Sequence, residues 1–258
     1  MELNFNQNIN KYYQNFPFKE IWELFYDPKK EWAIKLENDN YDRNKYFSDF
    51  YIWKKWVLKK RQCNLQISNY FEEIEIINLN FDVDLDEYDS IRMCCKNKKA
   101  CSECWKYAYW SILIMKWFFI NKLGEKKFFF FFSGRRGFHC FLFSKNKNFI
   151  FLRKREKLLE ILENTNILFN EEIKKEIDFI PNDFKIIFDK RVTLEPKHLI
   201  KLPFSLHTET LLPEIFLGNN KEIFINNPFE IDFTKEANLF ENIILFKQTY
   251  LNKDLDDN

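Results

Sequence analysis

Two apolar runs joined by a short basic turn constrain the fold more than any other feature of this sequence. Phe128–Phe132 is an uninterrupted run of phenylalanine, and Phe138–Phe143 is almost as apolar. Ser-Gly-Arg-Arg-Gly lies between them. Short apolar runs on either side of a glycine-containing turn are typical of a β-hairpin with buried strands.

Predicted strands and helices alternate along the rest of the chain. The hydrophobic spacing predicts helices at Phe18–Tyr26, Trp105–Leu123 (ending at Gly124), within 152–175 and near Asn238–Tyr250. It predicts further strands from about Glu73 to Asp86 and at Phe184–Thr193. No Gly/Ser/Pro-rich linker divides the chain, so we expect one α/β or α+β domain over residues 1–258.

The overall composition is that of an ordinary globular protein. The net charge of +1 across 258 residues indicates neither a nucleic-acid nor a membrane protein by itself. The N-terminus lacks the pattern of a signal peptide, and the most apolar segment, Tyr107–Ile120, is short and contains Lys116. We therefore expect an intracellular protein whose six cysteines are thiols or metal ligands.

The turn of the hairpin concentrates rare residues. The chain has only four glycines and three histidines, and Gly134, Gly137 and His139 all lie here. Glycines leave backbone amides open to a ligand, and Arg135 and Arg136 are suited to phosphate oxygens. Ser133 adds a hydroxyl donor. This pattern predicts a phosphate-binding turn, and the alternative is an exposed hairpin tip.

Aspartates alternate with apolar residues in the strand before the cysteines. Phe81, Val83 and Leu85 are expected on one face, and the carboxylates at positions 82, 84 and 86 on the other. Like charges at this spacing repel unless a cation lies between them, and Mg²⁺ or Mn²⁺ prefers carboxylate oxygen. The alternative is a solvated outer face of an antiparallel sheet.

Four cysteines lie within eleven positions, at Cys94, Cys95, Cys101 and Cys104. The Cys-x-x-Cys half has the spacing with which two sulfurs reach one tetrahedral Zn²⁺. The intervening Lys-Asn-Lys-Lys-Ala is not a core segment, which argues against the alternative of buried free cysteines. A structural zinc site is therefore predicted, whereas Cys63 and Cys140 are expected to be packing residues.

A fourth polar window lies towards the C-terminus. It contains Asp189, Lys201 and the other two histidines, His198 and His207. With the hairpin turn, it indicates one polar site assembled from segments that are distant in the sequence.

Together these windows resemble the small, catalytic subunit of eukaryotic and archaeal DNA primases, the eukaryotic form more closely. The similar stretches are FDVDLDEYDSIRMCC with CSECW, FFSGRRGFHCF and FDKRVTLEPKHLIKLPFSLH, in that order. YYQNFPF and EWAIKLENDNYDR near the N-terminus also resemble that subunit. The resemblance extends from about Tyr12 to Phe246.

The resemblance implies the archaeo-eukaryotic primase catalytic fold, with mixed sheets flanked by helices and an inserted zinc motif at 94–104. It implies that two Mg²⁺ or Mn²⁺ ions bind to Asp82, Asp84 and Asp189, and zinc to the four clustered cysteines. It implies that the incoming nucleotide contacts Ser133, Arg135, Arg136, His139, His198, Lys201 and His207. It also implies that Arg43 is needed for activity, with Glu31 beside it.

The implied activity is DNA-templated synthesis of short RNA primers from ribonucleoside triphosphates on single-stranded DNA. The implied partners are a primase large subunit and a replicative DNA polymerase complex, in the nucleus and without a membrane. Two alternatives stay open: a primase-polymerase that uses deoxynucleotides in repair, and a non-catalytic, zinc-stapled nucleic-acid-binding scaffold.

Two departures from the family stand out. A sizeable helical subdomain is reduced to a short segment, and 152–180 is expected to be its remnant. The stretch Tyr51–Lys60, which corresponds to a family strand near the ribose, lacks that strand's acidic residue and glycine. The ribose contact therefore has no assigned residue.

Overall fold

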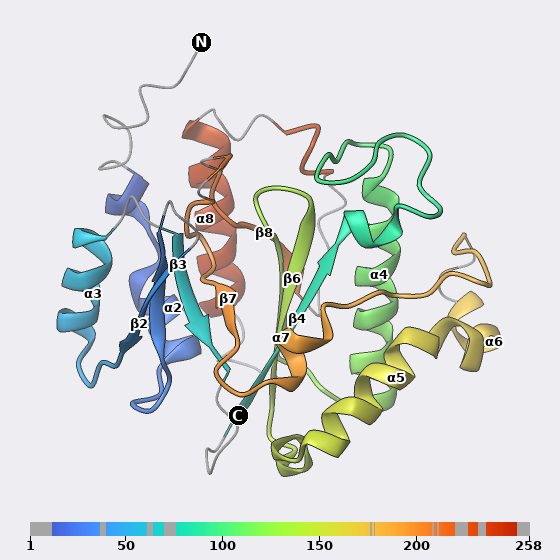
Figure 1. Cartoon of the computed structure of the whole chain (residues 1–258), viewed down its shortest axis with the longest axis horizontal. Helices are drawn as coiled ribbons and strands as arrows, with labels where there is room; N and C mark the ends of the chain where they lie inside the picture. The colour runs from blue at the N-terminus through green and yellow to red at the C-terminus, as the bar shows by residue number, and fades with distance from the viewer. Residues whose placement is uncertain are drawn as a thin grey trace.

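The computed structural model describes residues 12–36, 40–60, 64–69, 76–175, 177, 179–207, 209–210, 212–219, 227–231 and 236–251. They form two four-stranded sheets, both visible in Figure 1. The outer sheet has the order β2 (Tyr41–Lys45), β1 (Trp32–Lys35), β3 (Asn64–Ser68) and β7 (Leu199–Lys201). The central sheet has the order β4 (Ile77–Asp84), β6 (Gly137–Ser144), β5 (Phe128–Phe132) and β8 (Ile215–Asn219).

Every pairing between described strands is antiparallel. The expectation of mixed sheets is therefore wrong in this part of the chain, which is α+β. The pairing of β5 with β6 follows from their connection, since a tight turn can only reverse the chain.

Helices cover the sheets on both sides. The longer ones are α2 (Phe18–Phe25), α3 (Phe50–Lys59), α4 (Trp105–Phe118), α5 (Leu152–Leu168) and α8 (Glu236–Leu251). Shorter segments are η1 (Leu85–Tyr88), the π-helical turn η2 (Phe119–Leu123), η3 (Lys147–Ile150), α6 (Asn170–Lys174) and α7 (Lys190–Leu194). Helices α4 and α5 pack on one face of the central sheet, and the outer sheet with α2 and α8 lies on the other. Among the described residues, no helix is both long and apolar enough to cross a membrane.

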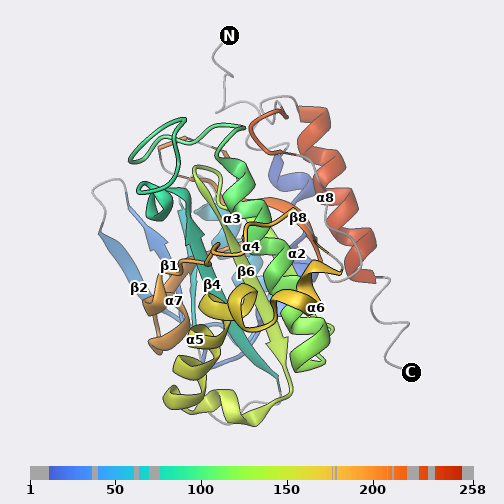
Figure 2. The same ribbon diagram turned by 90° about the vertical axis from the view of Figure 1, so that its right-hand side faces the viewer.

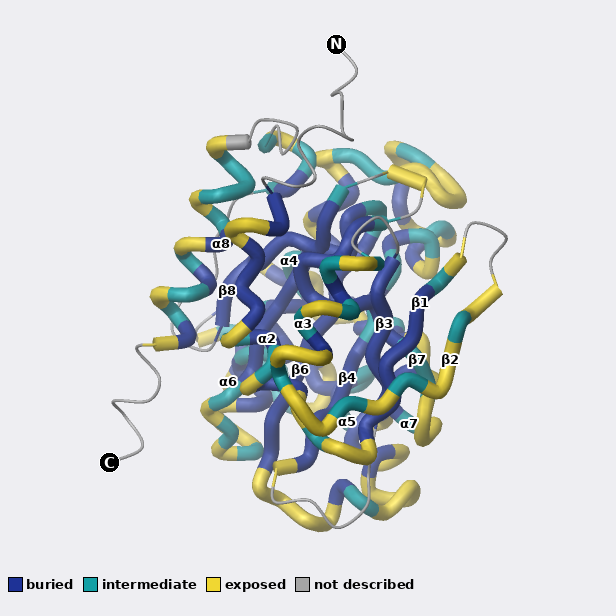
Figure 3. The backbone as a smooth tube through the Cα atoms, turned by 90° about the vertical axis from the view of Figure 1, so that its left-hand side faces the viewer, coloured by how far each residue is buried: buried dark blue, intermediate teal, exposed yellow. Residues whose placement is uncertain are grey.

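The predicted hairpin is confirmed as β5 and β6. Its register pairs Phe132 with Phe138 and Phe131 with His139. Phe128, Phe130 and Phe132 pack towards α4 and α5, whereas Phe129 and Phe131 pack towards the outer sheet and α8. The strands are thus buried on both faces, as the dark core of the tube in Figure 3 shows, and this explains why they are apolar without alternation.

Most predicted helices are confirmed, including the end of the 105–123 helix at Gly124. That glycine has a φ of 67°, the left-handed conformation expected of a helix C-cap. The helix ends in a π-helical turn rather than an α-helical one. Helix α8 and the pair α5 and α6 likewise match the predicted segments.

Two local predictions are wrong. Phe184–Thr193 is not a strand: its first half joins neither sheet, and Asp189 begins α7 by accepting a hydrogen bond from the Arg191 amide. Phe184, Ile186 and Phe188 alternate because they are buried in the core beside α4, not because they pair with a strand. The stretch Tyr51–Lys60 is mostly helix α3, and the strand preceding β4 in the chain is β3.

Candidate functional site

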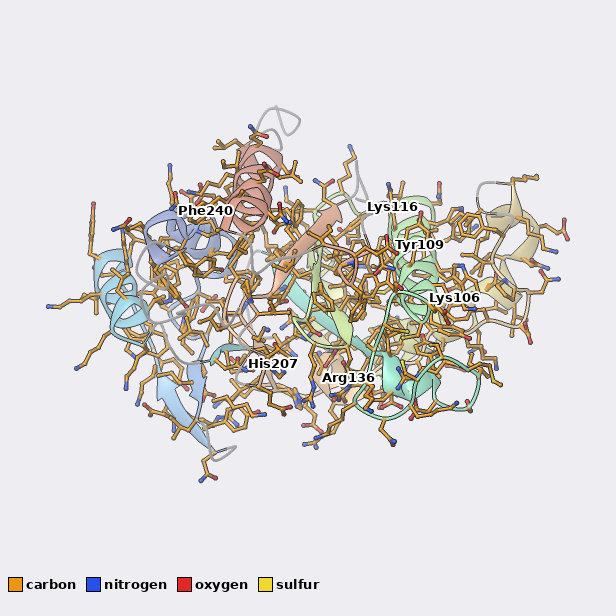
Figure 4. All side chains as sticks on the ribbon, turned by 90° about the horizontal axis from the view of Figure 1, so that it is seen from above. Lys106, Tyr109, Lys116, Arg136, His207 and Phe240 are labelled. Atoms are coloured by element: carbon orange, nitrogen blue, oxygen red, sulfur yellow. The ribbon has the colours of Figure 1, made fainter. Side chains whose placement is uncertain are left out.

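A pocket of about 240 Å³ opens between the two sheets. Most of the polar residues singled out in the sequence converge on it, from β4, the β5–β6 turn, α7 and β7. Figure 4 shows two of them, Arg136 and His207, on the same side of the molecule. Its lining residues are Lys35, Tyr41, Asn64, Gln66, Asp82, Asp84, Ser133, Arg135, Arg136, His139, Asp189, Val192, His198, Leu199, Ile200, Lys201 and His207.

The three aspartates come from two elements that touch. Asp82 and Asp84 project from β4 on the face opposite Phe81 and Val83, as the alternation predicted. Asp189 lies at the N-cap of α7, and its backbone amide donates to the Asp82 carbonyl oxygen at 3.0 Å. This contact holds the third acid beside the first two.

Asp86 departs from the predicted strand. The chain turns into the 3₁₀ segment η1 at Leu85, so Asp86 does not continue the row of carboxylates into the pocket lining. It accepts a hydrogen bond of 2.8 Å from Arg136 Nε instead. Leu85 still points into the core, as expected.

The electrostatics of this acidic group favour a cation. Burial and the neighbouring charge of Asp84 raise the pKa of Asp82 to about 7. The buried Asp82 Oδ1 has no hydrogen-bond donor among the described residues. An orphaned carboxylate oxygen beside two further acids fits a hard divalent cation such as Mg²⁺ or Mn²⁺.

The glycines and the serine of the hairpin turn mainly stabilise the turn and its contact with β4. A Cβ at Gly137 would lie 2.2 Å from the Val83 carbonyl oxygen, so glycine is required for the close approach of β4. The Gly137 amide donates to Ser133 Oγ at 3.2 Å and is not left open for a ligand, contrary to the expectation. Gly134 has a φ of 83°, which does favour glycine.

Both arginines of the turn contact carboxylates. Arg135 forms two hydrogen bonds with Glu209, at 2.8 and 2.6 Å. Arg136 NH2 lies 2.7 Å from Asp84 Oδ2, while its Nε binds Asp86. The guanidinium groups are therefore already arranged around acidic oxygens, and an anionic ligand would have to compete with these carboxylates.

His139 lies between two acids. Its Nδ1 is 2.8 Å from Glu214 Oε1, and its Nε2 is 3.7 Å from Asp82 Oδ1. Burial disfavours the imidazolium, but the charges of Glu214 and Asp82 outweigh burial and raise the pKa of His139. Glu214 is buried and was not anticipated from the sequence.

The basic wall of the pocket includes Lys201 and His207. Lys201 Nζ donates to the Ser133 carbonyl oxygen, and burial lowers the pKa of this amine to about 8. Burial, together with the positive charges of Lys201 and Arg135, lowers the pKa of His207 to about 3. His207 Nδ1 accepts the Glu209 amide at 3.1 Å, so this neutral ring carries its proton on Nε2.

Glu31 and Arg43 form a pair outside the pocket lining. Arg43 donates to both oxygens of the buried Glu31 carboxylate, at 2.8 and 3.0 Å. Arg43 NH2 also donates to the Lys197 carbonyl oxygen at 2.8 Å. The pair thus holds the segment next to His198, which does line the pocket. Its importance for activity stays a prediction.

The pocket also has an uncharged polar side that the sequence interpretation missed. Asn64 and Gln66 lie on β3, joined by a hydrogen bond of 2.5 Å from Gln66 Nε2 to Asn64 Oδ1, and Tyr41 lies on β2. Their signal was present, since polar amides alternate with apolar residues in a strand that is buried throughout. These groups can bind neutral hydroxyl or carbonyl groups rather than phosphate.

The four clustered cysteines converge on one point. Their Sγ atoms all lie within 4.8 Å of one another, and the closest pairs are 3.6–3.9 Å apart. Tetrahedral zinc with bonds of about 2.3 Å requires sulfurs about 3.8 Å apart. Four of the six sulfur pairs already have about this spacing, so the cluster could hold zinc. Among the described residues, only this group brings three or more metal-ligand atoms so close together.

A buried arginine supports the cysteine cluster. Arg92 NH1 lies 3.8 Å from the sulfurs of Cys95 and Cys104, and donates to the Lys99 carbonyl oxygen at 2.8 Å. Its Nε contacts Asp89 at 2.5 Å, just after η1. Four thiolates around one Zn²⁺ carry a net negative charge, which this guanidinium would partly offset.

The segment that carries most of the pocket lining matches a known protein family. The sequence profile of the DNA primase small subunit family matches residues 81–213, a range that begins within β4 and ends just before Glu214. The chain is 28% identical to the DNA primase small subunit of Saccharomyces cerevisiae, over 54% of this chain and 40% of that protein. It is 29% identical to the Caenorhabditis elegans protein of the same name, over 54% of this chain and 39% of the other.

The same-named protein of Schizosaccharomyces pombe is 28% identical, over 53% of this chain and 35% of that protein. The chain thus spans about two fifths or less of the length of these relatives. Because the profile covers more than half of the chain, the resemblance is confirmed at the level of the family. The chain belongs to the DNA primase small subunit family.

Proposed function

We propose that this chain is the catalytic subunit of a primase and makes short RNA primers on single-stranded DNA for replication. The observation that carries the proposal is the meeting of three carboxylates and a basic wall in one pocket between the sheets. This pairing suits a reaction in which a polyphosphate binds beside a reacting hydroxyl group.

The acidic side of the pocket would hold Mg²⁺ or Mn²⁺ on Asp82, Asp84 and Asp189. When bound, two such ions would activate the attacking 3′-hydroxyl and stabilise the leaving pyrophosphate. The role of the protein is to hold the three carboxylates in position. Asp82 and Asp84 are held by β4, and Asp189 is held by the hydrogen bond from its backbone amide to Asp82.

The basic side would bind and orient the triphosphate. Arg135 and Arg136 offer planar forks for phosphate oxygens, Lys201 a buried amine, and His207 an Nε2–H donor. Glu214 contacts Nδ1 of His139, and Nε2 on the other side of the ring faces Asp82. These groups would act by positioning the substrate, and its phosphates would have to displace Glu209 from Arg135.

The uncharged side leaves room for the nucleoside. This side is uncharged, whereas the side proposed to bind phosphate is basic. Its neutral hydrogen-bond donors and acceptors match a sugar or a base, and they belong to Asn64, Gln66 and Tyr41. We propose that zinc on the four cysteines serves structure, since a closed four-sulfur site leaves no position for substrate.

The partners and location are proposed by analogy with the family. The relatives are named small subunits, so we propose that a large subunit completes a heterodimer, within a replicative polymerase complex in the nucleus. The near-zero net charge supports weak DNA binding by this chain alone, because phosphate contacts supply most non-specific affinity.

The test is primer synthesis on a single-stranded DNA template with Mn²⁺, using ribonucleotides and deoxynucleotides in parallel. We expect ribonucleotide products from the natural sequence and none from Asp82→Asn. Asp42→Asn, which changes an acid on the exposed strand β2, is the matched control and should retain activity. Dominant deoxynucleotide incorporation would favour a repair polymerase, and no products from a folded natural chain and its large subunit would favour a non-catalytic scaffold.

A further inference from the structure

Helix α7 is the element that carries Asp189, and it is only five residues long. A helix of that length is not stable by itself, because nucleation costs more than so few hydrogen bonds return. The position of Asp189 at its N-cap therefore depends on what holds α7 in place.

One side of α7 is held by β4. The Asp189 amide donates to the Asp82 carbonyl oxygen at 3.0 Å, and Thr193 Oγ1 donates to the Asn80 carbonyl oxygen at 2.7 Å. These bonds fix the distance between the two elements. They do not fix the far side of the helix, which faces away from β4.

Helix α5 holds that far side at both ends of α7. Arg155 NH2 donates to the Leu194 carbonyl oxygen at 2.9 Å, at the last residue of α7. Glu163 Oε2 lies 2.9 Å from Lys190 Nζ, at the first residue. Figures 1 and 2 show α7 beside both β4 and α5.

The Arg155 guanidinium joins two segments at once. Its NH1 also donates to the carbonyl oxygens of Phe149 and Ile150, at 2.8 and 2.7 Å, where η3 ends. The residue is only 2% exposed. Burial lowers its pKa to about 10, and the charge of Glu156 offsets this only in part.

Burying a guanidinium group costs desolvation free energy, and a leucine or methionine at this helix position would be buried without that cost. What an apolar side chain could not do is cap the end of α7, whose carbonyl groups have no partners within the helix. The planar fork of arginine reaches both segments, which a lysine amine does less well.

We propose that α5 is a brace that sets Asp189 against Asp82 and Asp84, with Arg155 as the positioning residue. The segment at 152–168 then has a role in the metal site and is not only what is left of a larger helical region. The inference rests on the proposed role of the three aspartates as metal ligands.

The test is to measure Mn²⁺ binding to the zinc-loaded chain of 258 residues, with electron paramagnetic resonance used to quantify the free ion. We expect Arg155→Met to weaken Mn²⁺ binding about 10- to 100-fold, the usual range for a residue that orients metal ligands. Arg155→Lys should recover part of the loss. Glu163→Gln, at the more exposed contact, should weaken binding about two- to threefold.

Two controls separate positioning from stability. Arg153→Met changes an exposed arginine of the same helix and should leave Mn²⁺ affinity unchanged. Val57→Ala removes buried apolar volume from α3, in the core on the other side of the central sheet, and should lower stability without changing Mn²⁺ affinity.

Natural Mn²⁺ affinity in Arg155→Met would overturn the inference, and so would an equal loss in Val57→Ala. If Arg155→Met does not fold, Glu163→Gln and Lys190→Met carry the test, and natural affinity in both would overturn it. Failure of the natural chain to bind Mn²⁺ would instead refute the proposed metal site, so the two failures are distinguishable.

Discussion

Replacing Asp82 by asparagine should abolish catalysis and yet stabilise the metal-free protein. Burial and the charge of Asp84 raise the pKa of Asp82 from 3.8 to about 7. Between about pH 4 and pH 7 the unfolded chain loses this proton while the folded chain retains it. The free energy of unfolding therefore falls as the pH rises through this window, and above pH 7 the whole penalty is present.

The size of the penalty follows from the pKa. Each pKa unit corresponds to about 1.4 kcal/mol, so a rise of about three units makes ionised Asp82 cost the fold about 4 kcal/mol. Solvent reaches 22% of the side chain and screens part of this. We expect Asp82→Asn to be more stable than the natural chain by about 2–4 kcal/mol at pH 8, and by much less at pH 4.

Urea unfolding at pH 4, 6 and 8, without Mg²⁺ or Mn²⁺ and without chelator, measures this difference. Adding Mn²⁺ at 100 times its Kd should stabilise the natural chain by about 2.7 kcal/mol and so cancel most of this difference, because Asp82→Asn lacks a metal ligand. The reasoning would be refuted if Asp82→Asn were no more stable than the natural chain at pH 8. It would also be refuted if Mn²⁺ stabilised both chains equally.

Three further predictions concern the rest of the site. Glu209→Gln should lower the KM for ribonucleoside triphosphate about two- to threefold by releasing Arg135, as expected for a partly exposed ion pair; an unchanged KM would count against competition between Glu209 and phosphate. Arg92→Met should lower zinc affinity about 10- to 100-fold in a chelator competition, and natural affinity would show that the guanidinium does not support the thiolates. Gly137→Ala should destabilise the fold by at least about 1–3 kcal/mol in urea unfolding, because its Cβ would lie 2.2 Å from a carbonyl oxygen of β4. Gly124→Ala meets no atom within 4 Å, so its loss should be limited to the cost of the left-handed conformation at that position, about 1–2 kcal/mol. A smaller loss at Gly137 than at Gly124 would contradict the steric explanation.

What could be predicted from the sequence was local in origin. The hairpin of β5 and β6 followed from two apolar runs and a turn, and the cysteine cluster from spacing within eleven positions. The position of Asp82 and Asp84 on one face of β4, opposite Phe81 and Val83, followed from the two-residue period of a strand. Each of these depends on residues that are neighbours in the chain.

The errors arose where tertiary structure overrides a local pattern. Phe184, Ile186 and Phe188 have the alternation of a strand, but the core that they enter offers no strand to pair with. Asp189 directly before the helix was a usable N-cap signal. Asp86 continues the alternation in the sequence, but the strand ends before it because the chain turns into η1 at Leu85.

The missed residues depend on how the two sheets face each other. Glu214 meets His139 from 75 positions away in the sequence, and nothing near it marks the contact. Asn64 and Gln66 enter the pocket because β3 lies in the outer sheet, on the side that faces β4. No periodicity within one segment specifies which strands oppose each other across a gap.

The double burial of the hairpin has a consequence for how the protein melts. Alternate phenylalanines of β5 belong to two different hydrophobic cores. If one core loses its packing, β5 is exposed on that side, and the other core loses the support of the same strand. The two halves should therefore melt together, in one calorimetric transition whose van't Hoff enthalpy equals the measured heat. A mutation on either face of β5 should shift that single transition and should not split it.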